Sequence, residues 1–152
     1  MITIDTPERV RRHTAAHVNA RIDTQIEDRI RAYAGRTPFE ITQRIEELDQ
    51  EWDVERVLET NASTLALLGL ALGATVDRKW YWLSGTVMGF LLLHGVHGWC
   101  PPLPLLRRLG VRTRREIDRE KYALKQLRGD FRVGSAPVVP DESEAEAALA
   151  SV

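Results

Sequence analysis

Three side chains that could carry chemistry lie close together in the sequence. His94, His97 and Cys100 are each three residues apart, so a continuous helix would place them on roughly one face. Imidazole and thiolate groups are common protein ligands of transition metals and haem. Cys100 is the only cysteine in the chain, and a closed metal site needs about four ligands. We therefore predict no metal site and no cofactor, and His94 and His97 remain weak candidates for metal ligands.

Cys100 could instead act alone as a reactive thiol. It is followed by Pro101 and, a few residues later, by Arg107 and Arg108; a nearby positive charge favours the reactive thiolate. Such a thiol would suit sulfur handling or redox signalling. The alternative is a small buried apolar residue, because apolar surroundings disfavour the thiolate. The sequence offers no Ser–His–Asp set, phosphate-binding glycine loop or paired carboxylates, so we predict no catalytic residue and no enzyme.

The charges that surround these residues are segregated along the chain. The net charge is −1 over 152 residues, and the composition, 43% hydrophobic and 28% charged, is typical of a soluble globular protein. Residues 1–60 carry a net charge of −4, residues 61–106 carry +1, residues 107–132 carry +6 and residues 133–152 carry −4. A general nucleic-acid binder would be basic overall, so we expect no nucleic-acid partner.

The nearly uncharged block predicts a transmembrane helical hairpin over residues 56–106. No residue from Thr60 to Val76 is ionisable, and none from Trp80 to Leu106 is formally charged. Because a spanning helix needs roughly 17–25 apolar residues, we expect spans over about 57–76 and 80–100. The alternative is a buried hairpin in a soluble bundle, but the rest of the chain offers little amphipathic helix to cover it.

Aromatic residues stand at the ends of the predicted spans. Trp80, Tyr81 and Trp82 open the second span, Trp99 lies near its end, and Trp52 precedes the first span. Trp and Tyr are enriched at membrane interfaces. The 19 residues from Trp80 to Trp99 would rise about 28 Å in a helix, close to the thickness of one bilayer core. We therefore predict that all five side chains are interface anchors.

The flanking charges predict the orientation of the hairpin. Six arginines lie between residues 107 and 119, whereas the loop at 77–79 has only two basic residues, and Arg and Lys accumulate on the cytoplasmic side. We expect a bacterial inner-membrane protein, with the lipid bilayer as a partner, both termini in the cytoplasm and loop 77–79 outside.

Each predicted span carries a pair of glycines four residues apart. Gly69 and Gly73 lie on the first span, and Gly85 and Gly89 lie on the second. This spacing lets two helix backbones approach closely in a membrane. One pair could form the contact within the hairpin and the other could bind a partner. The predicted function is a non-enzymatic assembly or accessory subunit that self-associates or docks on a larger complex.

The flanks predict cytosolic amphipathic helices, which completes an all-α fold. Within residues 1–55, proline and capping-box signals predict helices over about 7–34 and 38–52. These helices pack together or lie on the membrane surface. A capping box at Thr113–Glu116 opens a basic juxtamembrane helix within 107–132, ended by Gly129. This helix contacts lipid headgroups or is merely solvated. The acidic tail, 133–152, is expected to be disordered.

Several short motifs lie between residues 61 and 113: Asn61 at the start of the first span, the short charged turn at 77–79, Gly98-Trp99-Cys100-Pro101 and Leu109-Gly110-Val111-Arg112-Thr113. By these motifs the segment from Asn61 to Thr113 resembles the YgaP-like inner-membrane domain family, and residues 51–56 also look like an extension found in longer members. The resemblance implies a bacterial two-helix inner-membrane domain that self-associates through its spans and has largely unknown function. Some members are fused to a rhodanese domain. These 152 residues contain no such domain, so sulfur transfer is not implied.

Overall fold

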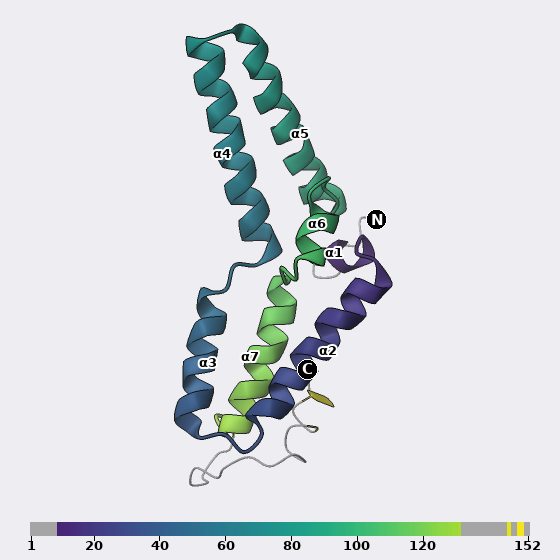
Figure 1. Cartoon of the computed structure of the whole chain (residues 1–152), viewed down its shortest axis with the longest axis vertical. Coiled ribbons are helices and arrows are strands. Elements are labelled where there is room, and N and C mark those ends of the chain that lie inside the picture. Colours follow the sequence, from purple (N-terminus) through teal and green to yellow (C-terminus); the bar gives the residue numbers. More distant parts are fainter. Residues whose placement is uncertain (1–8, 132–145, 147–148, 151–152) are drawn as a thin grey trace. The chain divides into compact units, whose positions relative to one another are not determined.

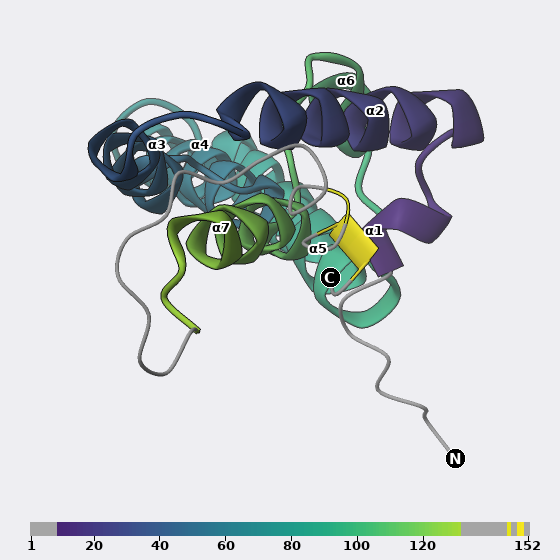
Figure 2. The same cartoon turned by 90° about the horizontal axis from the view of Figure 1, so that it is seen from below.

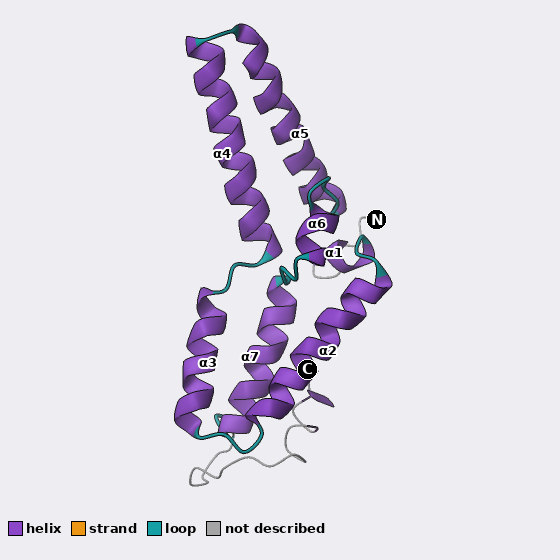
Figure 3. Ribbon diagram, in the orientation of Figure 1, coloured by secondary structure: helices purple, strands orange, loops and turns teal. Residues whose placement is uncertain are grey.

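The computed structural model describes residues 9–131, 146 and 149–150. Every regular element in the described part of the chain is helical, which confirms the predicted all-α class (Figure 3). The helices are α1 (Arg9–Arg12), α2 (Ala16–Tyr33), α3 (Pro38–Gln50), α4 (Val54–Thr75), the short 3-10 helix η2 (Arg78–Trp80), α5 (Tyr81–His97), α6 (Leu103–Arg108) and α7 (Arg114–Arg128). The predicted disordered tail, 133–152, lies almost wholly outside the described residues.

The chain divides into two compact units. Of the described residues, those within 1–18 and 52–111 form one unit, which we call the hairpin unit, and those within 19–51 and 112–152 form the other, which we call the head bundle. This division differs from the predicted boundaries at 55 and 106. The difference arises because α7 packs against α3, so that the predicted juxtamembrane helix belongs to the same unit as the N-terminal helices.

The head bundle is built from amphipathic helices whose apolar stripes meet. α2, α3 and α7 group together in two perpendicular views (Figures 1 and 2). The buried positions recur at three- and four-residue spacing, which places them on one helix face; they include Ile22, Ile26, Ile30, Ile41, Ile45, Leu48, Ile117, Leu124 and Leu127. Because these stripes are buried in the bundle, they are not available to a membrane surface.

Both predicted capping boxes are confirmed. The Thr37 side chain accepts from the Glu40 amide at 3.3 Å while the Glu40 carboxylate accepts from the Thr37 amide at 3.0 Å. Thr113 and Glu116 repeat this exchange at 3.3 and 2.8 Å. Gly129, with φ of +88°, ends α7 in the left-handed conformation that glycine adopts without strain, as predicted.

The segregated charges of the sequence come together in this bundle. Residues 19–51 contain five basic and eight acidic residues, and residues 112–131 contain seven basic and four acidic ones, so their net charges of −3 and +3 cancel. Arg119 lies 3.6 Å from carboxylate oxygens of both Asp23 and Glu27, and Lys121 pairs with Asp49. These basic side chains of α7 therefore face acidic residues of α2 and α3.

In the hairpin unit, α4 and α5 run side by side in opposite directions (Figure 1). The Asp53 carboxylate accepts from the Arg56 amide at 2.8 Å and caps α4, so this helix begins three residues before the predicted start at 57. A Cβ atom on Gly69 would lie 2.5 Å from Ser84 Oγ, and one on Gly73 would lie 2.6 Å from the Tyr81 ring. The first glycine pair thus forms the contact within the hairpin.

The two predicted membrane spans are only partly reproduced. By length and composition alone, one helical segment of the described residues could cross a membrane, Pro38–Thr75, which includes α3 and α4. Of the two predicted spans, about 57–76 and 80–100, only the first lies in a segment of this kind, and the helix of the second, α5, has 17 residues. Only 22% of the apolar 18-residue stretch within this segment is buried. The core helix of a soluble protein would be mostly buried.

The second helix ends earlier than the predicted residue 100 because α1 packs against its end. Gly98 adopts a left-handed conformation, with φ of +75°, and a side chain there would collide with Arg9. Arg9 Nη1 donates to the Gly95 carbonyl at 2.6 Å and so satisfies a group that the helix end leaves open. The same packing interrupts the predicted helix over 7–34, which is divided between α1 and α2.

Candidate functional site

The second glycine pair lies on an open face of the hairpin. A Cβ atom added to Gly85 or Gly89 would have no neighbour within 4 Å. The two pairs therefore have different surroundings, although their sequence spacing is the same. Gly69 and Gly73 are covered by α5 and the residue before it, whereas Gly85 and Gly89 leave a shallow strip where another helix backbone could approach closely.

Large apolar side chains cover both hairpin helices and point outward. In α5, which has no Asp, Glu, Lys or Arg, Ser84 is the only buried residue. Its hydroxyl donates to the Ala66 carbonyl at 2.8 Å and so joins the two helices. The exposed large apolar residues of the pair include Leu65, Leu67, Leu68, Leu70, Val76, Met88, Phe90, Leu92 and Val96. Soluble monomers rarely expose an apolar surface of this extent.

The predicted aromatic anchors are exposed at both ends of the hairpin. Trp80, Tyr81 and Trp82 lie at the η2 end, and Trp99 and Trp52 lie at the opposite end. Tyr81 also packs its ring over Gly73. The Arg56 guanidinium lies 4.5 Å from the centre of the Trp52 ring, which is within the range of a cation–π contact.

An apolar groove of about 430 Å³ lies within the hairpin unit. Leu58 and Leu65 line it from α4, Val87 and Phe90 line it from α5, and Cys100 lines it from the turn that follows. Asn61 contributes a polar side chain, but its amide donates to the Val57 carbonyl at 2.7 Å. The groove therefore offers shape and apolar surface rather than reactive groups.

The structure separates the three residues that were predicted to share a helix face. α5 ends at His97, and Cys100 follows the left-handed Gly98, so the predicted common face was wrong. Cys100 is 6% exposed and packs in a core cluster with Val10, Val54, Leu58 and Leu103. His94 is half-buried and His97 is exposed. In the described part of the chain, no group of three or more His, Cys, Asp or Glu side chains could hold a metal ion.

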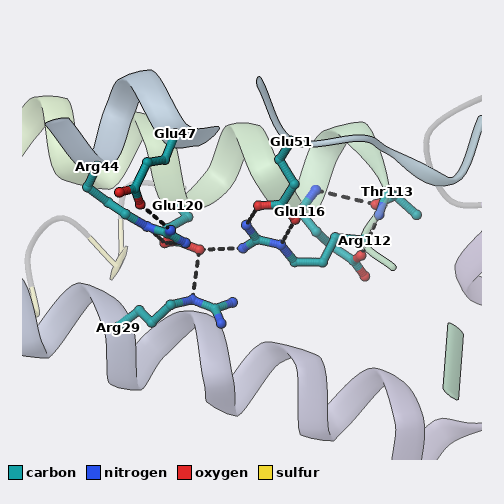
Figure 4. A network of polar contacts seen from close by, with 8 residues as sticks. All are labelled: Arg29, Arg44, Glu47, Glu51, Arg112, Thr113, Glu116 and Glu120. Atoms are coloured by element: carbon teal, nitrogen blue, oxygen red, sulfur yellow. Dashed lines mark hydrogen bonds and ion pairs between the residues drawn. The ribbon is translucent and has the colours of Figure 1, made fainter. Parts of the chain in front are cut away.

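A buried ionic network holds the head bundle together (Figure 4). Glu120 is fully buried, and its carboxylate accepts from Arg29 Nε at 3.1 Å and from Arg44 Nη2 at 2.9 Å. Arg112 donates to the same carboxylate and also pairs through two nitrogens with Glu51. One carboxylate thus joins arginines from α2, α3 and the start of α7.

The network stabilises Glu120 as a carboxylate. Burial alone would raise the pKa of Glu120, but Arg112, followed by Arg29 and Arg44, outweighs it and holds this pKa below its ordinary value. A carboxylate that is both engaged by three guanidinium groups and difficult to protonate is poorly suited to proton transfer. Its arrangement fits a role in fixing the bundle.

The sequence analysis missed Glu120, Ser84 and Arg107. Glu120 lies three residues after Ile117 and four before Leu124, on the apolar face of α7. This position could have predicted that the Glu120 side chain is buried and paired with arginine. Ser84 could have been found as a hydroxyl in an uncharged helix, where it needs a partner on the neighbouring helix. Arg107 is fully buried and donates to Thr14 and to the Val111 carbonyl; its position within a basic run gave no such signal.

No family model, no curated protein and no solved structure matches this chain. The relation to the YgaP-like family stays a prediction from the sequence motifs.

Proposed function

We propose that this chain is a small bacterial inner-membrane protein that acts as a non-enzymatic assembly or accessory subunit. On this proposal α4 and α5 cross the bilayer as a hairpin. One observation carries it: α5, a 17-residue helix without Asp, Glu, Lys or Arg, buries only Ser84 and leaves most of its other residues exposed. Lipid is the surrounding that such a helix would find favourable.

The distribution of basic residues supports an orientation for the hairpin. Arg56, Arg107 and Arg108 lie at the end where α4 begins, whereas Arg78 and Lys79 are the basic residues of the opposite loop. By the positive-inside rule, the end where α4 begins faces the cytoplasm and loop 77–79 faces outward. On the motifs of residues 61–113 we also propose a relation to the YgaP-like domain.

The open glycine pair supports assembly as the function. A second hairpin, or a helix of a larger membrane complex, could approach Gly85 and Gly89 closely, because no side chain stands in the way. The described residues of the hairpin gather no group of three or more His, Cys, Asp or Glu side chains that could hold a metal ion. The proposed activity is therefore contact with another membrane helix.

Self-association in a bilayer tests the proposal. The full chain would be reconstituted in lipid vesicles, and energy transfer between donor- and acceptor-labelled copies would be measured. We expect transfer in the wild type and its loss in the Gly85→Ala/Gly89→Ala variant, because two methyl groups would separate the backbones. Gly95→Ala is the matched control, since Gly95 is equally open but lies on another face of α5.

Three outcomes would each contradict a part of the proposal. Release of the wild type from membranes by alkaline carbonate would exclude a membrane-spanning hairpin. A wild type that neither self-associates nor co-purifies with another membrane protein would exclude an assembly role, and a Gly85→Ala/Gly89→Ala variant that assembles as well as Gly95→Ala would exclude this glycine pair as the contact surface.

A further inference from the structure

Positive charge is concentrated at one end of the hairpin unit. α1 contributes three arginines, α6 contributes two, and the first turn of α4 contributes one. Arg107 is fully buried, and the other five are at least partly exposed. We call these five the basic collar: Arg9, Arg11, Arg12, Arg56 and Arg108. The described residues of this end, 9–18, 52–60 and 98–111, contain all six arginines and only three acids, Asp53, Glu55 and Glu59, so the net charge is +3.

The collar is held in place against the ends of the hairpin helices. Arg9 donates to the Gly95 carbonyl near the end of α5, and Val10 beside it packs in the core cluster with Val54 of α4. The buried Arg107 Nε donates to Thr14 Oγ1 at 3.3 Å and so ties α6 to the residues after α1. The collar is thus part of the folded hairpin unit.

The collar lies beside two of the exposed aromatic residues. Arg56 stacks on Trp52 at 4.5 Å, and Arg9 packs against Gly98, which directly precedes Trp99. Tryptophan at the end of a membrane helix marks the level of the lipid headgroups. If the hairpin crosses the bilayer as proposed above, the arginines of the collar lie at this level.

The head bundle does not offer a comparable surplus of charge. Its described residues 19–51 and 112–131 contain twelve basic and twelve acidic residues, and cations of α7 such as Arg119 and Lys121 pair with acids of α2 and α3. The basic helix that the sequence suggested for headgroup contact is therefore the weaker candidate, and the collar is the stronger one.

We propose that the basic collar binds the headgroups of anionic phospholipids in the cytoplasmic leaflet. Guanidinium groups bind phosphate through paired hydrogen bonds, and Arg side chains beside an anionic leaflet are attracted to its surface potential. The collar selects anionic lipid for the shell around the hairpin and holds α1 and α6 at the membrane surface. This inference rests on the proposed membrane function and names the lipid class that the hairpin prefers.

Lipid selectivity of the reconstituted full chain tests the inference. Spin-labelled phosphatidylglycerol and phosphatidylcholine would be compared by electron paramagnetic resonance, which reports the motionally restricted lipid around the protein. We expect the wild type to prefer phosphatidylglycerol several-fold and the Arg12→Gln/Arg108→Gln variant to lose most of this preference. Both arginines are exposed, so the variant should keep its fold.

The matched control is Arg114→Gln/Arg115→Gln, which removes two exposed charges from α7. It should retain the wild-type preference, and added salt should weaken the preference of both proteins. A wild type without preference, an unaffected collar variant, or a control that loses as much would each overturn the inference. A chain that does not enter bilayers at all would overturn the proposed function and this inference together, whereas a well-incorporated chain without preference would overturn only the inference.

Discussion

Replacing Glu120 with glutamine should destabilise the head bundle strongly, although the two side chains have almost the same size. The Glu120 carboxylate is fully buried and accepts hydrogen bonds from Arg29, Arg44 and Arg112. Glutamine has one acceptor oxygen in place of two. If that oxygen accepts from Arg44, the amide nitrogen of the glutamine must face the donor groups of Arg29 and Arg112. The three arginines also lose the negative charge that they share.

The expected cost is large because the Glu120 carboxylate is fully buried. Removing one partner of a buried ion pair costs about 3–5 kcal/mol. At about 1.4 kcal/mol for each tenfold change, the opening equilibrium of the bundle should rise by roughly a hundred- to several thousandfold. Glu46→Gln is the matched control, because it removes one acid from the exposed surface of α3; its effect should remain within about 0.5 kcal/mol.

Hydrogen–deuterium exchange read by mass spectrometry measures this opening locally. Peptides from residues 19–51 and 112–131 report the head bundle, and peptides from α4 and α5 report the hairpin in the same sample. We expect Glu120→Gln to accelerate exchange in the bundle peptides and to leave the hairpin peptides nearly unchanged. An effect no larger than that of Glu46→Gln would refute the central role assigned to Glu120.

The same variant has a pH dependence of definite sign. The pKa of Glu120 is lower in the folded chain than in the unfolded chain, where it is about 4.3. The contribution of the Glu120 carboxylate to the stability of the bundle is therefore fully present at a pH above the pKa of the unfolded chain. This contribution is lost as the pH falls through the pKa of the folded chain. The difference between wild type and Glu120→Gln should be largest near neutral pH and should shrink below about pH 4. A difference that grows on acidification would contradict this account.

Three further changes test the local geometry. Thr113→Ala removes the cap of α7 and should cost about 1 kcal/mol, seen as faster exchange in its first turn; unchanged exchange would argue against the cap. Gly69→Ala should destabilise the hairpin by about 1–3 kcal/mol through overpacking in a thermal-unfolding assay in detergent, whereas Gly95→Ala should not; equal effects would contradict the assigned faces. The buried Cys100 should react with a maleimide far more slowly than a cysteine introduced at the 60%-exposed Leu105, and equal rates would disprove its burial.

Much of the head bundle was predictable because its signals are local. The Thr37 and Thr113 capping boxes need only residues three positions apart, and the isoleucine stripe of α2 needs only the helical period. The break between α1 and α2 was not predictable in this way. It accompanies the packing of Arg9 against Gly98, which lies 89 residues further along the chain, and the spacing of apolar residues carries no information about such a contact.

The candidate interface was predictable in composition but not in geometry. Both glycine pairs have the same spacing, so the sequence could not tell which pair faces inward. Ser84 decides this, because its hydroxyl reaches the Ala66 carbonyl on the opposite helix and its Oγ fills the space beside Gly69. Glu120 was missed for a different reason: it is charged and was not considered as a core residue, although its spacing from Ile117 and Leu124 puts it among core positions.

The hairpin helices have unequal lengths, with 22 residues in α4 and 17 in α5. At 1.5 Å per residue these lengths correspond to about 33 and 25 Å, one longer and one shorter than a hydrocarbon core of about 30 Å. The uncharged part of α4, from Thr60 to Thr75, has only 16 residues and a rise of about 24 Å, because the first turns of this helix carry Glu55, Arg56 and Glu59. On the proposed placement, both helices would therefore offer an apolar stretch shorter than the hydrocarbon core. The lipid around the hairpin would thin, and the protein would accumulate in membranes or membrane regions of lower thickness.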